Sequence, residues 1–174
     1  MDLFETDDLM DLRTDRLKLR RPRMTDAAAL VPAINHWDVA RWVSAIPHPY
    51  TDQDAQDFLT RIQDGAYPTW SIFEDDVLAG GIGIPNEFGY WLAPSAWGRG
   101  IATEAGRAVL AWHFENAAND VTTRYLQGNA GSARVLSKLG FREIGSSTCS
   151  SIAAGENLPS ISLVLTQADW DAVR

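Results

Sequence analysis

A short loop with two glycines is the most chemically informative part of the sequence. Gly98-Arg99-Gly100 follows a strand-like stretch and precedes a helical pattern that reaches Trp112. Glycines let a backbone approach a ligand closely, and a helix start directs free N–H groups and the positive end of the helix dipole at one point. The pattern predicts an anion site, although two glycines also suit a tightly packed helix start without a ligand.

Two nucleotide-binding motifs can be tested at this loop. A Walker-type phosphate loop requires Gly-x-x-x-x-Gly-Lys followed by Ser or Thr, and the sequence lacks it. A dinucleotide fingerprint requires a third small residue where Thr103 stands and an acid at the end of the next strand, whereas Asp120 precedes its strand. The sequence therefore excludes both motifs.

A second group of polar residues opens another predicted helix, over residues 129–139. Asn129 is a favoured N-cap residue, and Ser132 lies on the same first turn. Capping and ligand contact are both compatible with Asn129. Arg134 is a candidate phosphate partner, whereas Lys138 suits the negative end of the helix dipole.

The elements that must position these residues form one α/β domain over residues 12–174, after an acidic leader at residues 1–11. Helical periodicity predicts helices that follow Thr25-Asp26 and Thr51, besides the two named above. We expect turns at Asp75-Asp76 and Pro85-Asn86 to make an antiparallel meander. The predicted strands are residues 12–23, 69–74, 77–84, 87–93, 121–127, 141–147 and 160–165, and we expect the last of them to complete the fold.

Composition excludes several classes of function. The 174 residues include 15 Lys and Arg against 23 Asp and Glu, so the formal net charge is −8. Such a surface repels nucleic acid and anionic membranes and would attract a cationic substrate, although more often an acidic surface only keeps a protein soluble. Cys149 is the only cysteine, so no intramolecular disulfide and no Cys/His zinc site are expected. The acidic N-terminus does not resemble a secretory signal, no run is long enough to span a membrane, and we expect a cytoplasmic protein without a metal.

The two glycine- and serine-containing motifs together resemble the GNAT acyltransferases. In that family the pattern Gln/Arg-x-x-Gly-x-Gly/Ala binds acetyl-CoA, and Trp97-Gly98-Arg99-Gly100-Ile101-Ala102 is similar to it except at Trp97. The preceding Gly-Tyr-Trp-Leu and the downstream run from Asn129 to Phe141 resemble the branch that contains the ribosomal-protein alanine N-acetyltransferases. The resemblance extends from Leu12 to about Leu165. It implies a single-domain GNAT fold, with a mixed, mostly antiparallel sheet, flanking helices and splayed central strands at the acetyl-CoA site.

The resemblance also implies which residues hold acetyl-CoA. The pyrophosphate would lie on the N–H groups from Gly98 to Thr103, with Arg99 adding a positive charge. A backbone N–H near Leu92 would polarise the thioester carbonyl. Ser132 would protonate the leaving thiolate, because Leu136 stands where many members have a tyrosine; otherwise the thiolate leaves unassisted. The residues implied for acetyl-CoA binding are Trp91, Leu92, Ala93, Trp97, Gly98, Arg99, Gly100, Ile101, Ala102, Thr103, Asn129, Ser132 and Arg134.

The acceptor is expected to be a primary amine that attacks directly, without a covalent enzyme intermediate. Glu87 is the candidate base, acting through water, although a solvated turn glutamate is an equal alternative. His36, His48 and His113 are weaker candidates, since a lone histidine is more often structural. The resemblance places the loop with Trp37, Trp42, His48 and Tyr50 beside the acceptor, and simple packing is an equal alternative for these four. The residues expected to contact the acceptor are Trp37, Trp42, His48, Tyr50 and Tyr90.

The branch suggests a protein N-terminal amine as the acceptor. The alternatives are a small amine, amino acid or antibiotic, or a non-catalytic acyl-CoA-binding sensor. A monomer and a homodimer are both compatible with the sequence.

Overall fold

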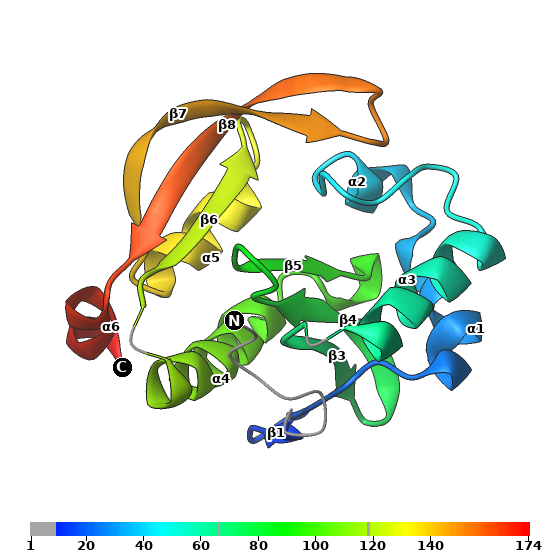
Figure 1. Ribbon diagram of the computed structural model, residues 1–174, viewed down its shortest axis with the longest axis horizontal. Coiled ribbons are helices and arrows are strands. Elements are labelled where there is room, and N and C mark those ends of the chain that lie inside the picture. The colour runs from blue at the N-terminus through cyan, green and yellow to red at the C-terminus, as the bar shows by residue number, and fades with distance from the viewer. Residues whose placement is uncertain (1–9, 66, 118) are drawn as a thin grey trace.

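The computed structural model describes residues 10–174, except residues 66 and 118. The expected acidic leader, residues 1–11, lies almost entirely outside the described residues. The remaining chain forms two antiparallel sheets with helices against them (Figure 1). This confirms the expected mixed α/β class and its mostly antiparallel pairing.

The first sheet has the order β1-β2-β3-β4-β5. The one expected strand over residues 12–23 is instead a short hairpin, because Thr14 reverses the chain: its N–H donates to the Leu17 carbonyl, and its hydroxyl accepts from the Leu17 N–H, both at 3.0 Å. Asp75 and Asp76 form the expected turn with positive φ. The strands are β1 (Leu12–Arg13), β2 (Leu17–Arg20), β3 (Thr69–Glu74), β4 (Val77–Gly83) and β5 (Gly89–Leu92).

The second sheet has the order β6-β8-β7. Its strands are β6 (Val121–Leu126), β7 (Arg142–Ser151) and β8 (Glu156–Leu165). Strands β7 and β8 are longer than expected, because they pair with each other from Arg142 and Val164 out to Ser151 and Glu156. Figure 1 shows this hairpin as an arch that reaches toward α2 (Trp37–Ala40), where the N–H of Ile152 donates to the Ser44 carbonyl at 3.0 Å.

The four expected helices are present, and the described residues add α2, α6 and two short 3-10 helices, η1 and η2. Helix α2 has a single turn, too short for periodicity to detect, and α6 follows the last strand, which was expected to end the fold. Helix α6 begins with a capping box between Thr166 and Asp169. Besides α2, the helices of the described residues, α6 included, are η1 (Met24–Asp26), α1 (Ala27–Ile34), α3 (Asp52–Asp64), η2 (Pro94–Ala96), α4 (Ile101–Asn116), α5 (Ala130–Lys138) and α6 (Gln167–Val173). Among the described residues, no helix is long and apolar enough to cross a membrane.

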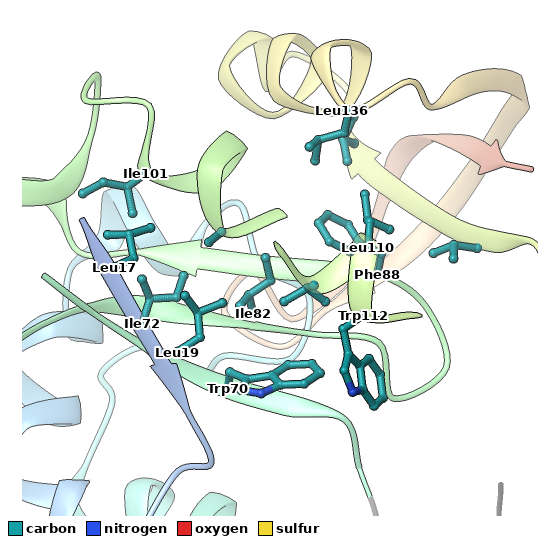
Figure 2. Close-up of a cluster of buried hydrophobic side chains, with 14 of the residues drawn as sticks. Leu17, Leu19, Trp70, Ile72, Ile82, Phe88, Ile101, Leu110, Trp112 and Leu136 are labelled. Atoms are coloured by element: carbon teal, nitrogen blue, oxygen red, sulfur yellow. The ribbon is translucent and has the colours of Figure 1, made fainter. Parts of the chain in front are cut away.

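The first sheet has a hydrophobic cluster on each face. On one face, Leu19, Ile72 and Trp70 meet the apolar side of α4, where the rings of Trp70 and Trp112 pack edge to face at 5.0 Å (Figure 2). On the other face, α1 and α3 pack over Leu78 and Phe73. Alternate residues of β3 therefore face opposite layers, as a two-sided sheet requires. In β4 a register shift opposite Ile72 and Phe73 interrupts the alternation, so that Ala79 and Ile82 both face the α4 layer. This packing fixes the position of β5 and of the start of α4.

A largely buried ion pair links β2 to the first helices. The guanidinium of Arg20 donates to both carboxylate oxygens of Asp26, at 2.9 and 2.7 Å, and the side chains are only 13% and 7% exposed. Burial alone would raise the pKa of Asp26, but the hydrogen bonds from Arg20 and from the Arg23 N–H hold it below its ordinary value. The carboxylate form of Asp26 therefore stabilises the fold.

We expect Asp26→Asn to lower the free energy of unfolding by about 3 kcal/mol, because it leaves Arg20 buried without its counter-charge. The contribution of the carboxylate is present above the unfolded-state pKa of about 4, and is lost as the pH falls through the lowered pKa of the folded state. Urea unfolding of the wild type, Asp26→Asn and Asp38→Asn at neutral pH measures the loss caused by each substitution. The same measurement on the wild type at falling pH measures the loss of the carboxylate contribution. Asp38 pairs with Arg41 at an exposed site, so its variant should change little. Equal effects from the two variants would contradict this account.

Candidate active site

The two sheets meet at the start of β5 and then diverge. The N–H of Phe88 donates to the Thr122 carbonyl at 2.8 Å, and the Thr123 hydroxyl donates to the Phe88 carbonyl at 2.6 Å. Beyond Phe88, β5 pairs only with β4, and β6 pairs only with β8. The strands thus separate as expected, and β5 has a free edge toward the gap.

The free edge of β5 carries the peptide groups of Tyr90 and Leu92. The Ala93 N–H donates to the Ala79 carbonyl at 2.9 Å, so alternation directs the peptide groups of Trp91 and Ala93 toward β4 and those of Tyr90 and Leu92 away from it. The indole N–H of Trp97 donates to the outward carbonyl of Leu92 at 3.0 Å. The outward N–H groups are therefore available to a ligand lying along β5.

The start of α4 lies just beyond this edge and is not capped by a side chain. Gly98 and Gly100 have φ of 72° and 78°, and Gly100 occupies the N-cap position. The first helical hydrogen bond runs from the Glu104 N–H to the Gly100 carbonyl, so the N–H groups of residues 101–103 have no partner within the helix. Because Ile101 and Ala102 are buried, only their backbones are available there.

A charged network holds this loop against the first hairpin. The guanidinium of Arg16 donates to Glu104 at 2.6 and 2.9 Å and to the Arg99 carbonyl at 3.1 Å, and the Thr14 hydroxyl also donates to Glu104. Partial burial would raise the pKa of Glu104, but these hydrogen bonds hold it below its ordinary value. The guanidinium of Arg99 pairs with Glu74 at 2.7 Å. Its charge, expected to serve the pyrophosphate, is therefore directed at Glu74 here.

The start of α5 brings the hydroxyl of Ser132 to the gap, where it meets the hydroxyl of Tyr90 on β5. The side chain of Asn129 accepts from the Ser132 N–H at 3.0 Å, which confirms the expected capping role. The hydroxyl of Ser132 accepts from the Tyr90 hydroxyl at 3.3 Å. Leu136, one turn later, is 1% exposed in the core. Sequence reasoning assigned Tyr90 to the acceptor and missed this contact, which depends on two elements far apart in the chain.

The candidate base forms a salt bridge across the diverging strands. Both carboxylate oxygens of Glu87 accept from the guanidinium of Arg124, at 2.5 and 2.9 Å, and both side chains are more than a third exposed. The pairing fixes the carboxylate where β5 and β6 begin to separate. Its remaining lone pairs are open to water.

The residues expected to contact the acceptor separate into two groups. Trp42 lines the gap, and so does Tyr50, whose ring is buried and whose pKa burial raises to about 12. Trp37 and His48 do not line it; their rings pack against each other edge to face at 5.6 Å. His36 binds the Pro32 carbonyl and His113 the Asn119 carbonyl, as expected for structural histidines.

One cleft of about 1220 Å³ joins these parts. It runs between the diverging strands and is bounded by the starts of α4 and α5, by α2 and α3, and by the tip of the β7–β8 hairpin at Ile152. Ala93 and Arg99 are the residues expected to bind acetyl-CoA that do not line it. The expected residues that do are Trp91, Leu92, Trp97, Gly98, Gly100, Ile101, Ala102, Thr103, Asn129, Ser132 and Arg134, together with Glu87 and Tyr90.

Charges are unevenly distributed along the cleft. Three carboxylates, those of Asp38, Asp54 and Asp57, line it from α2 and α3 beside Arg61, whereas α5 contributes the cations of Arg134 and Lys138. The α5 side thus suits an anionic ligand, and the α2–α3 side a cationic one. Among the described residues, no group of three or more histidine, cysteine or acidic side chains is placed to hold a metal ion.

Comparison with known proteins identifies the family of this fold and cleft. The family model described as an acetyltransferase (GNAT) domain matches residues 16–142. The chain belongs to the GNAT acetyltransferase family. It is therefore an acyltransferase, and the family expected from its two motifs is confirmed.

Relatives of this GNAT acetyltransferase share its sequence or its fold. An N-acetyltransferase named p20 from Bacillus licheniformis is 28% identical over 150 residues, which cover 77% of this chain and 83% of p20. The ribosomal-protein-S5-alanine acetyltransferase of Vibrio fischeri has a TM-score of 0.76 at 19% identity, covering 92% of this chain and 98% of that one. Mycobacterium smegmatis RimJ, in complex with CoA-disulfide, has a TM-score of 0.77 at 22% identity, covering 92% and 87%. The two solved structures establish a shared fold.

Proposed function

We propose that this GNAT acetyltransferase transfers the acetyl group of acetyl-CoA to a primary amine, and that the amine is the N-terminus of a protein. The observation that carries the proposal is the continuity of the cleft: the free edge of β5 leads from the uncapped start of α4 to the acidic lining of α2 and α3. An anionic donor and a cationic acceptor therefore have adjoining sites of suitable charge.

The chain's own groups fit acetyl-CoA. The free N–H groups of residues 101–103, in the first turn of α4, would bind the pyrophosphate, and Arg134 would add a cation from α5. The outward N–H groups of Tyr90 and Leu92 match the polar groups of an extended pantetheine arm. Acetyl-CoA supplies an activated acetyl thioester, and the N–H of Leu92 would stabilise the negative charge that develops on its carbonyl oxygen.

Two proton movements are assigned to side chains in the cleft. The amine must be neutral to attack, and Glu87, fixed by Arg124, would accept its proton through a water molecule. The hydroxyl of Ser132 would protonate the sulfur as the thiolate leaves. Because the amine attacks the thioester directly, no side chain needs to carry the acetyl group.

The choice of a protein N-terminus is supported by several features. Two proteins of the same fold are a ribosomal-protein-S5-alanine acetyltransferase and a RimJ. Ribosomal proteins are basic, and this chain has a net charge of −8 with acidic residues lining the acceptor side of its cleft. The expected cytoplasmic location and the oligomeric state stay predictions.

An acceptor screen tests the substrate class. Thiol release from acetyl-CoA is followed with peptides that begin with Ala or Ser, with the same peptides bearing a blocked N-terminus, and with free amino acids and small polyamines. We expect turnover with the free N-termini, and a mass gain of one acetyl group at the α-amine. Turnover with the small amines but not with the peptides would show that the acceptor is a small molecule and not a protein. Binding of acetyl-CoA without any thiol release would favour a sensor.

A further inference from the structure

Helix α5 has no tyrosine one turn after Ser132, where many GNAT enzymes have one, because Leu136 stands at that position. Its side chain is 1% exposed and packs in the core cluster with α4, so the position one turn after Ser132 presents no polar group to the cleft. Any hydroxyl that assists Ser132 must come from another element.

Tyr90 supplies such a hydroxyl from β5. Its ring lies 6.2 Å from Phe88 between centroids, and Phe88 in turn lies 5.4 Å from Phe141, so an aromatic row holds it. Its hydroxyl donates to the Ser132 oxygen at 3.3 Å, and both residues line the cleft. Burial raises the pKa of Tyr90, which keeps the phenol protonated and able to donate at neutral pH.

We propose that Tyr90 is a positioning residue for the leaving-group proton: by donating to the Ser132 oxygen, it directs the Ser132 hydroxyl proton at the CoA sulfur. The inference rests on the function proposed above. A serine hydroxyl has one proton and rotates freely, so occupying its oxygen from one side leaves the proton to point elsewhere. The Ser132 N–H is already bound by Asn129, which fixes the backbone from which the hydroxyl projects.

The proton balance of the step is simple. As the carbon–sulfur bond breaks, its electron pair goes to sulfur, and sulfur takes the proton of Ser132. Ser132 in turn takes the proton that Tyr90 donates, and the phenolate is reprotonated from water that enters the cleft. The amine proton leaves separately through Glu87.

A double-mutant cycle in kcat tests the relation between the two hydroxyls. Tyr90→Phe keeps the ring and removes only the hydroxyl; we expect kcat to fall about tenfold, with the KM for acetyl-CoA unchanged within about twofold. Ser132→Ala should lower kcat about 100-fold. In the Ser132→Ala background, Tyr90→Phe should have no further effect, because Tyr90 acts only through Ser132. If Tyr90→Phe lowered kcat about tenfold in the Ser132→Ala background as well, the proposal would be overturned.

Binding of free CoA provides a readout that does not depend on turnover. At about pH 9 much of the CoA thiol is ionised, if its pKa is near the 8.5 of cysteine. A hydroxyl proton directed at the sulfur then stabilises the bound thiolate of CoA, whereas acetyl-CoA has no thiolate. Tyr90→Phe and Ser132→Ala should therefore each weaken CoA binding, measured by calorimetry, by roughly tenfold and leave acetyl-CoA binding unchanged. Equal weakening of both ligands would indicate a purely structural role and overturn the proposal.

Tyr67→Phe is the matched control, since it removes the hydroxyl of an exposed tyrosine that does not line the cleft. It should change neither kcat nor CoA binding. A wild-type protein that binds no acetyl-CoA would overturn the proposed function and this role together. A wild-type enzyme that turns over, beside a Tyr90→Phe variant of equal kcat, would overturn the role of Tyr90 alone.

Discussion

Replacing Gly100 with valine should abolish acetyl-CoA binding while the protein remains folded. Gly100 has φ of 78°, and a Cβ there would meet only the Arg16 guanidinium, at 3.9 Å, so the side chain fits but the backbone conformation does not. Strain of about 1–3 kcal/mol would draw the loop out of its left-handed turn and redirect the N–H groups that follow. Loss of two such contacts to a charged group weakens binding by roughly 100-fold or more.

Gly155→Val is the matched control for backbone strain. Gly155 lies in the turn between β7 and β8 with φ of 71° and open space around its Cβ position, so the same substitution imposes the same kind of strain away from the loop. Calorimetry should show acetyl-CoA binding near the wild-type value for Gly155→Val and none for Gly100→Val. Thermal unfolding should show similar, modest losses for both. If Gly100→Val still bound acetyl-CoA, this loop would not be the pyrophosphate-binding site.

Replacing the Leu92 amide with an ester should lower kcat by about 100-fold or more. Incorporation of the α-hydroxy analogue of leucine removes the N–H and keeps the side chain, which packs against the core. The lost N–H is the one on the free edge of β5 that would stabilise the developing oxyanion, and single donors of this kind contribute factors of about 10²–10³. Presteady-state measurement of acetyl transfer checks the effect on the chemical step.

The neighbouring residue gives the control for this substitution. An ester at Trp91 removes an N–H directed at β4, so it should cost stability without a comparable loss in kcat. Equal kcat losses at both positions would mean that strand integrity, and not the Leu92 donor, sets the rate. The N–H of Tyr90 lies on the same free edge. If an ester at Tyr90, and not at Leu92, lowered kcat, the oxyanion donor would be the N–H of Tyr90.

Local patterns in the sequence predicted the parts of the site that short segments build. Two glycines before a helical pattern indicated the start of α4, and Asn129 three residues before Ser132 indicated the cap of α5. The meander from Thr69 to Leu92 followed from alternation and from the Asp75-Asp76 turn. These features depend on residues that are neighbours in the chain, which periodicity and turn chemistry describe well.

Contacts between distant segments were not predictable in the same way. The Arg99 guanidinium was expected to face the pyrophosphate, but Glu74 on β3 lies within 2.7 Å of it. The contact of Tyr90 with Ser132 requires the divergence of β5 from β6, which sets how far apart those residues lie. Helix α6 was missed even though Thr166 and Asp169 form a capping box that the sequence displays.

A calorimetric titration of the purified protein with acetyl-CoA is the first measurement to make, because every role proposed above requires this cleft to bind acetyl-CoA. NAD and ATP serve as controls, because both carry phosphates but neither has a pantetheine arm to pair with the edge of β5. We expect micromolar binding of acetyl-CoA at one site per chain, and no comparable binding of NAD or ATP. No binding of acetyl-CoA, or equal binding of all three, would contradict the proposed acetyl-CoA site.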